Sequence, residues 1–313
     1  MSTQLASSNH AVGTAAVPHL KLPGAQDAQP RCVSFWQLGT QITGGHWFEL
    51  YRAAPKTLHE NDGFDYVVKL INPHLTGDDA ARAVARMGRE AVSTDVVEHR
   101  SVIPLLDAEL DQAPFYLVQP WIAGGSFDKF LAMADTVSLT RMLWIIRQIA
   151  EALVAAHEKG RIHLGLEPSH VLVGNGGRVS LIGWSNSHAV DQVVSKREIP
   201  LQLARYTAPE CFDEGCPAKK ASDVYSLALF IYHGFAGHTP FHGATHQEIA
   251  AAHQNKDVPS LIRHQPLCPS RLSDLVQWML NSNPADRPSS REVLDQLISI
   301  EIENLSNPAV LSL

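Results

Sequence analysis

The chain has 313 residues, of which 45% are apolar and 18% are charged. This composition is typical of a folded protein and excludes disorder along the whole chain, and the length is sufficient for two lobes with their own cores. A net charge of -7 excludes an overall basic field, so we expect neither nucleic acid nor a membrane surface as a partner.

The first part of the chain changes character near residue 30. Residues 1–30 are rich in Ala, Ser, Pro and Gln and have no periodic apolar pattern. Such a segment buries too little apolar surface to offset its chain entropy, so a flexible N-terminal tail is predicted. Short apolar runs then alternate with Gly, Pro and Asn-Asp breaks, as at 47–51 and 66–71, and this pattern predicts strands of an antiparallel sheet.

One helix and two more strands complete this first lobe. Apolar residues recur every three to four positions between 76 and 97, with acidic residues at the start, which predicts a helix. Strands are expected at 102–108 and 115–119. We therefore place an N-terminal lobe (N-lobe) at 31–118, followed by a hinge at 119–125.

The remainder, residues 126–301, is mostly helical in its pattern, and residues 302–313 are expected to form a C-terminal tail. Ser138 is a predicted N-cap of a long helix that ends before Gly160. The predicted fold is α+β and bilobal. It has a five-stranded antiparallel N-lobe sheet with one main helix, and a mostly helical C-terminal lobe (C-lobe).

The cysteine and histidine patterns do not predict a metal site. The chain has four cysteines, too few for a disulfide framework in a chain of this length, so reduced thiols and a cytoplasmic location are expected. The histidines between 233 and 253 are interpreted as belonging to a solvated loop rather than to a metal site or a pH sensor.

Several short motifs follow one another in a fixed order. They are Val67-Val68-Lys69, Glu90, Ile162-His163, Ala208-Pro209-Glu210, Ser222-Asp223-Val224-Tyr225-Ser226 and Asp286-Arg287-Pro288. In this order and spacing the chain resembles the protein kinases, in particular the bacterial eukaryotic-like Ser/Thr kinases. Each match is weak alone, but their common register over residues 34–300 is specific. The resemblance implies a protein-kinase-like domain at 31–301.

The resemblance also implies roles for the matching residues. Lys69 would contact the nucleotide phosphates and form an ion pair with Glu90 on the N-lobe helix. Glu210 and Arg287 would form a buried ion pair, and Asp223 would hold the backbone of the loop that follows His163. These last four residues are expected to maintain the fold rather than to take part in chemistry.

The same comparison predicts that the catalytic groups are lost. Gly165 stands where a kinase has its catalytic Asp, so the substrate hydroxyl would lack a base. His170 and Gly183 stand where two magnesium ligands are expected, and neither offers the oxygen that this cation prefers. Glu167 replaces a Lys that steadies the γ-phosphate. Leu164 replaces the Arg that reads a phosphorylated activation segment.

Nucleotide binding is left open by the sequence. Gly45 is the one glycine of the phosphate-binding loop that is kept, and Thr43 and Phe48 replace the others. Pro120 and Ile122 would still offer a carbonyl and an amide to an adenine. We therefore expect that no cofactor is required, that ATP or ADP binding is weak if it occurs, and that magnesium is not bound.

These observations favour a catalytically impaired pseudokinase that acts as a signalling scaffold or an allosteric binding module. The expected partner is a protein, either an active kinase or a substrate of one. The alternative is a Ser/Thr protein kinase with residual or non-standard activity that uses a displaced acid such as Glu167 or Asp191. The sequence identifies neither the partner nor the oligomeric state.

Overall fold

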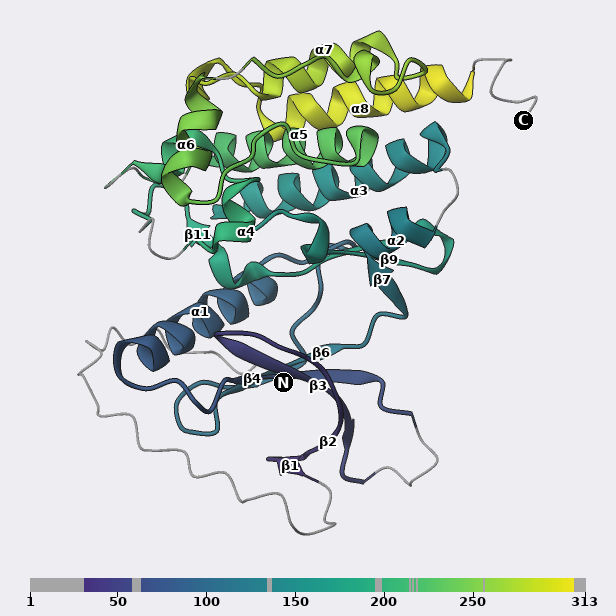
Figure 1. Cartoon of the computed structure of the whole chain (residues 1–313). Helices are drawn as coiled ribbons and strands as arrows, with labels where there is room; N and C mark the ends of the chain where they lie inside the picture. The colour runs from purple at the N-terminus through teal and green to yellow at the C-terminus, as the bar shows by residue number, and fades with distance from the viewer. Residues whose placement is uncertain are drawn as a thin grey trace.

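The structure is a computed structural model that describes residues 31–57, 63–133, 137–194, 199–213, 215, 217, 219–255 and 257–306. The predicted tail at 1–30 lies outside these residues, as does most of the one predicted at 302–313. The described chain forms two lobes, a sheet with one long helix and a larger helical lobe, which confirms the bilobal α+β fold (Figure 1).

The N-lobe sheet has six strands rather than the predicted five, in the order β1-β2-β3-β4-β6-β5. They are β1 (Cys32–Val33), β2 (Trp36–Gly44), β3 (Phe48–Pro55), β4 (Tyr66–Ile71), β5 (Asp107–Glu109) and β6 (Tyr116–Pro120). The additional strand is β1, which folds back on β2 so that Val33 pairs with Trp36. Two residues are too few to give an alternating pattern in the sequence.

The strand predicted at 102–108 is largely wrong. Regular pairing begins only at Asp107, because Pro104 has no N–H to donate to a ladder. The residues before it contact the C-lobe instead: Ile103 donates its backbone N–H to the Leu181 carbonyl at 3.2 Å. This segment therefore links the two lobes.

The single N-lobe helix, α1 (Gly77–Val96), agrees with the predicted one. Asp78 and Asp79 lie in its first turn, where they interact favourably with the helix dipole. Ala83, Met87 and Glu90 recur on its buried face, at the spacing of one side of a helix. Glu90 is thus an acidic residue on the buried face of this helix.

The C-lobe is built from seven α-helices in the described residues, with short strands and turns at the edge that faces the N-lobe (Figure 1). The helices are α2 (Phe127–Met133), α3 (Leu139–Glu158), α4 (Leu201–Ala204), α5 (Lys220–Ala236), α6 (His246–Asn255), α7 (Ser270–Met279) and α8 (Ser290–Leu305). The strands are β7 (Gly124–Ser126), β8 (Arg161–Ile162), β9 (Val171–Gly174), β10 (Val179–Leu181) and β11 (His188–Ala189). The 3-10 turns used below are η1 (Pro168–His170), η3 (Trp184–Asn186) and η5 (Pro209–Phe212).

Helices α3 and α5 form the centre of the C-lobe core. The Ser138 side chain accepts a hydrogen bond from the Arg141 N–H at 3.3 Å, as expected for the N-cap of α3. Helix α5 is buried along most of its length because its sequence is apolar on all sides. Helix α8 continues past residue 301 to Leu305, and Asn304 donates to the Thr140 hydroxyl of α3 at 2.9 Å.

A buried ion pair joins η5 to the loop before α8. Both terminal nitrogens of Arg287 donate to the carboxylate of Glu210, at 2.8 and 2.9 Å. The Arg287 side chain is fully buried and that of Glu210 is 9% exposed. Ser222 at the start of α5 donates to the same carboxylate at 2.7 Å. The contact expected between these residues is thus confirmed, and it ties three segments of the C-lobe together.

Replacing Glu210 with Ala should lower the free energy of unfolding by about 3–5 kcal/mol, because Arg287 would stay buried without its carboxylate. Urea unfolding followed by circular dichroism measures this. Glu303→Ala is the matched control, since Glu303 pairs with Arg271 on the exposed surface of the same lobe, where an ion pair contributes roughly 0–1 kcal/mol. Equal losses in the two variants would contradict the structural role of Glu210.

Candidate functional site

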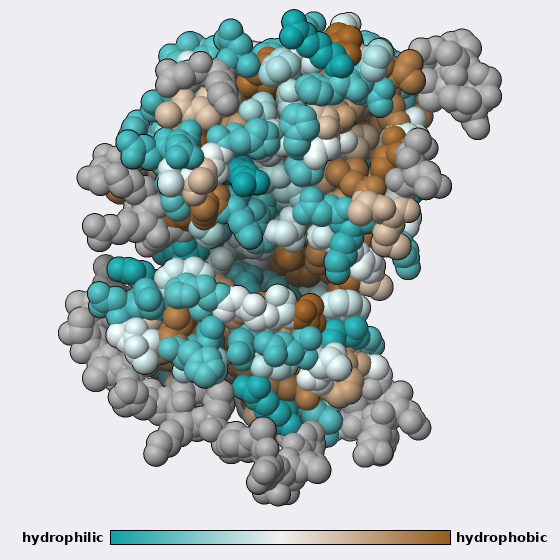
Figure 2. Space-filling view, viewed as in Figure 1, coloured by the Kyte–Doolittle hydropathy of each residue, from teal (hydrophilic) through white to brown (hydrophobic). Residues whose placement is uncertain are grey.

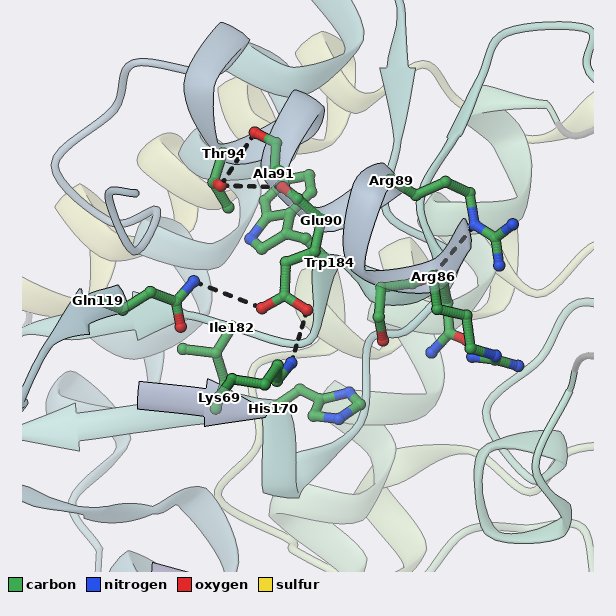
Figure 3. Close-up of polar contacts among 12 residues, drawn as sticks. Lys69, Arg86, Arg89, Glu90, Ala91, Thr94, Gln119, His170, Ile182 and Trp184 are labelled. Carbon is green, nitrogen blue, oxygen red and sulfur yellow. Dashed lines mark hydrogen bonds and ion pairs between the residues drawn. The ribbon is translucent and has the colours of Figure 1, made fainter. Parts of the chain in front are cut away.

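The candidate site lies between the two lobes, which a shallow groove separates in the space-filling view (Figure 2). Lys69 on β4 and Glu90 on α1 meet at its N-lobe side, with 2.6 Å between Nζ and Oε2. The Lys69 side chain is 12% exposed and that of Glu90 is 1% exposed. Gln119 donates to the second oxygen of Glu90 at 3.4 Å (Figure 3). The predicted ion pair is confirmed, whereas the nucleotide-binding role of Lys69 and Glu90 stays a prediction.

A cluster of hydroxyl groups around Arg161 holds α1 against the C-lobe. The hydroxyls of Ser93 on α1 and Ser187 after η3 are 2.6 Å apart. Arg161 on β8 donates to the Ser93 hydroxyl from Nε at 2.9 Å and from Nη2 at 2.7 Å. Burial lowers the pKa of Arg161, and the positive charge of Arg89 lowers it further. This cluster, here called the Ser93–Arg161–Ser187 cluster, keeps Glu90 turned towards Lys69.

Sequence reasoning missed this cluster. Its members lie on three different elements, and none of them forms part of a motif. Arg89 adds a further contact of the same kind, from its Nε to the Ser185 carbonyl at 3.2 Å. No periodicity or spacing in the sequence brings such distant residues together.

The loop after His163 takes its shape from Asp223 at the start of α5. Its carboxylate accepts the backbone N–H groups of His163 and Leu164, both at 2.8 Å, and Nε2 of His157 at 2.9 Å. Burial raises the pKa of Asp223, but the hydrogen bonds from His157 and from the backbone N–H of His163, together with the electrostatic influence of these histidines, outweigh it and keep the pKa below its usual value. Leu164 has a φ of 51°, a costly conformation for this residue type, which these bonds hold in place.

His163 is a neutral, buried part of the same loop. Its Nε2 lies 3.0 Å from the Ile182 carbonyl, and its Nδ1 accepts the Gly165 N–H at 3.2 Å. This arrangement requires the proton on Nε2. Burial lowers the pKa of His163 to about 4. The ring of Trp184, which is fully buried, meets His163 edge-on at 4.4 Å and donates to the Leu181 carbonyl at 3.1 Å.

Gly165, the position at which the kinase resemblance implies a catalytic Asp, is closely surrounded by other atoms. Gly165 is buried, and a Cβ added there would lie 3.0 Å from the Gly183 carbonyl and 3.1 Å from Nδ2 of Asn186. A longer side chain at this position would have to displace those atoms. Gly165 has no side-chain proton acceptor, and the atoms around it leave little room for a longer side chain.

The two expected metal positions are packed against each other. His170 at the end of η1 has its Nδ1 2.6 Å from the Gly165 carbonyl. Gly183 has a φ of 83°, and a Cβ there would lie 2.4 Å from Cγ of His170. The imidazole ring therefore fills the space that a side chain at 183 would need. These residues do not fit magnesium, which prefers several oxygen ligands in an octahedral arrangement.

In the part of the chain that the structure describes, no group of three or more His, Cys, Asp or Glu side chains could hold a metal ion. Glu167 accepts a hydrogen bond from the Ser169 hydroxyl at 2.7 Å and lies 3.7 Å from Nε2 of His170. Its carboxylate is thus engaged within its own loop.

The loop between β2 and β3 is held close to β4. The Gly45 N–H donates to the Phe48 carbonyl at 2.8 Å, and Asn72 donates to the Gly45 carbonyl at 3.0 Å. The ring of Phe48 lies over Lys69, with its centroid 4.8 Å from Nζ. The role of Gly45 towards phosphates stays a prediction.

The connection between the lobes is an extended segment. Pro120 ends β6 opposite Tyr66, and the next residue, Trp121, donates its N–H to the Asp65 carbonyl at 2.8 Å. Ile122 is half-buried and packs against the C-lobe core. The adenine contacts expected at Pro120 and Ile122 stay a prediction.

The histidines near α6 have different environments. His238, His242 and His246 are exposed, in agreement with a solvated loop. His253 does not agree with it: the residue is buried, with its Nδ1 2.8 Å from the Tyr225 hydroxyl, and burial lowers its pKa to about 4.

Of the four cysteines, for which no metal site is expected, Cys216 lies outside the described residues.

A model of the family described as "Protein kinase domain" matches residues 52–298. Within the described residues, no helix has the length and apolar character needed to cross a membrane.

Similar proteins include bacterial kinases. Serine/threonine-protein kinase PknL of Mycobacterium tuberculosis (strain ATCC 25618 / H37Rv) is 26% identical over 242 residues, which cover 77% of this chain and 60% of that protein. Serine/threonine-protein kinase PknA of Mycobacterium tuberculosis (strain ATCC 25177 / H37Ra) is 28% identical over 258 residues, 80% of this chain and 58% of that protein. Serine/threonine-protein kinase PrkC of Bacillus subtilis (strain 168) is 22% identical over 261 residues, 83% of this chain and 39% of that protein. The chain thus spans at most 60% of the length of these relatives.

Replacing Arg161 with Ile should loosen α1, because Ser93 and Ser187 would lose their charged donor. A hydrogen bond from a charged group contributes about 1.5–3 kcal/mol, so amide hydrogen exchange in residues 84–96 should accelerate roughly tenfold or more. Arg178→Ile, at an exposed position of the same lobe, is the control. Unchanged exchange in α1 of the Arg161 variant would show that the Ser93–Arg161–Ser187 cluster does not hold the helix.

Replacing Gly183 with Asp should destabilise the protein, because the new Cβ collides with the His170 ring and the backbone at 183 is left-handed. Adding His170→Asn should recover part of the loss, since the smaller side chain removes the collision. Thermal unfolding of the single and double variants measures the coupling between the two positions. Strictly additive effects would contradict the packing of His170 against Gly183.

Proposed function

Because this chain belongs to the protein kinase domain family, we propose that it is a pseudokinase, a kinase-shaped module that binds a partner protein without transferring phosphate. The observation that carries the proposal is the His170 ring packed against Gly183. At this point the expected magnesium carboxylate is absent and its space is occupied. The loss thus extends beyond one residue type to the shape of the site.

The chemistry of phosphoryl transfer supports this proposal. A positioned base contributes about 10² to 10⁴ in rate, and Gly165 offers none. Magnesium supplies charge stabilisation for the transferred phosphoryl group, and the residues at 170 and 183 do not fit this cation. Glu167 adds a negative charge where the γ-phosphate would lie, which disfavours the triphosphate further.

The parts that hold the kinase shape are kept, which favours a role in binding. Lys69 and Glu90 are paired, Asp223 fixes the loop, and Glu210 is paired with Arg287. A rigid two-lobed surface can act as a scaffold or allosteric module without any chemical step. The proposed partner is a protein, either an active kinase or a substrate of one, and the proposed location is the cytoplasm. No cofactor is needed for such a role.

The second candidate is a Ser/Thr protein kinase with residual or non-standard activity. The relatives are named serine/threonine-protein kinases, and this favours the second candidate. The Lys69–Glu90 ion pair is also compatible with an active arrangement. Glu167 is the displaced acid that such a mechanism would need, since it lies on the same loop as Gly165. The geometry around Gly165, His170 and Gly183 favours the pseudokinase.

The two candidates are separated by transfer of the γ-phosphate from radiolabelled ATP to the chain itself and to a generic basic protein substrate, with magnesium or with manganese. We expect no transfer above the background of a buffer control, because base and metal ligands are missing together. Lys69→Ala is the control for contaminating kinases, whose activity this variant does not alter. Transfer that is present in the wild type and disappears in Lys69→Ala would overturn the pseudokinase and establish the second candidate.

A further inference from the structure

Phe48 has an unusual place for a residue at the start of β3. It pairs with Ile71 across the sheet, and Leu50 pairs with Lys69. Residues that pair directly, and residues two apart on one strand, share a face of a sheet, so Phe48 and Lys69 lie on the same face. The Phe48 ring covers the Lys69 ammonium, with 4.8 Å between the centroid and Nζ.

Apolar contacts hold the ring in this position. Phe48 packs against the cluster of Met87, Ala91 and Leu117, which comes from α1 and β6. The ring is therefore fixed to the helix that carries Glu90 and does not hang from a loose loop. Lys69 is in contact with the Glu90 carboxylate on one side and with the ring on the other, and both interactions compensate its charge.

The C-lobe side of the same space is also filled. The His170 ring lies on the same side of the Glu90 carboxylate as Lys69 (Figure 3) and is packed against Gly183. The Glu167 carboxylate lies 3.7 Å from His170. The end of the groove at which a nucleotide would place its phosphates therefore presents an aromatic ring, an imidazole and a carboxylate.

The hinge end is different. Pro120 and Ile122 are half-buried, and Ile122 and Ile182 present apolar side chains packed on the C-lobe core. A planar, uncharged ring system matches such a surface.

We propose that Phe48 closes the phosphate end of the groove together with His170, so that the groove admits an uncharged ligand of nucleoside size and excludes nucleoside di- and triphosphates. The proposal rests on the pseudokinase assignment and specifies which ligand class its groove takes. Phe48 determines this specificity because its ring lies against the Lys69 ammonium, which a phosphate would otherwise contact. A triphosphate binds only after the ring has left Lys69 and its apolar cluster.

The test is isothermal titration calorimetry of the full chain with adenosine, ADP and the non-hydrolysable analogue AMP-PNP, each with and without magnesium. In the wild type, adenosine should bind more tightly than either phosphorylated ligand, and magnesium should change neither. In Phe48→Gly the affinity for AMP-PNP should rise roughly tenfold or more, as expected when a charged group regains a cationic hydrogen-bond donor. Adenosine affinity should change by less than about threefold, since its site lies at the hinge.

Phe35→Gly is the matched control, because Phe35 belongs to the same lobe but is exposed and lies outside the groove. Phe48→Leu keeps an apolar side chain in the cluster but removes the aromatic ring. It gives the same comparison if the glycine variant fails to fold. Three results would overturn the proposal: no adenosine binding to the wild type at millimolar concentration, tighter binding of AMP-PNP than of adenosine, or equal AMP-PNP affinity in wild type and the Phe48 variants.

This outcome is independent of the one that tests the proposed function, because AMP-PNP does not support transfer. Gain of phosphate transfer in Phe48→Gly with ATP would contradict the pseudokinase and still agree with the closing role of Phe48. Absence of an adenosine preference in the wild type, with no phosphate transfer, would leave the pseudokinase intact and refute the role of Phe48.

Discussion

The carboxylate of Asp223 is the group on which the loop at the centre of the molecule depends. It is fully buried and accepts the backbone N–H groups of His163 and Leu164, and the side chain of His170 takes no part in these bonds. The loop thereby keeps a strained backbone at Leu164 that its own sequence would not maintain. The shape of the loop is thus set through main-chain atoms and does not depend on a side chain at Gly165.

Helix α1 is held in place by contacts with both lobes. The Lys69–Glu90 ion pair holds α1 against the N-lobe sheet, and the Ser93–Arg161–Ser187 cluster holds it against the C-lobe. None of these contacts requires a metal ion, a nucleotide or a phosphorylated residue. The order of the groove is therefore no measure of its catalytic ability.

The sequence was informative where a residue type has few physical alternatives. The ion pair of Glu210 with Arg287 was implied by the resemblance to the kinases. The long helices could be predicted from the residues alone, because helical periodicity is strong over many turns. Short elements could not: β1 has only two residues, and Pro104 prevented regular pairing in the strand expected from residue 102. The residue types at 170 and 183 could be read from the sequence, but the packing of the His170 ring against Gly183 depends on tertiary structure. The placement of Arg161 beside Ser93 depends on it as well.

Trp184 limits how the segment between β10 and β11 can move. Its indole is fully buried, bonded to the Leu181 carbonyl and packed edge-on against His163. Expelling so large a ring would open a cavity and leave a buried polar group without its bond, at a cost of about 3–5 kcal/mol or more. Trp184 therefore anchors this segment to the C-lobe core. Because Ser185, Asn186 and Ser187 are bonded to α1, a movement of one lobe against the other would have to break these contacts.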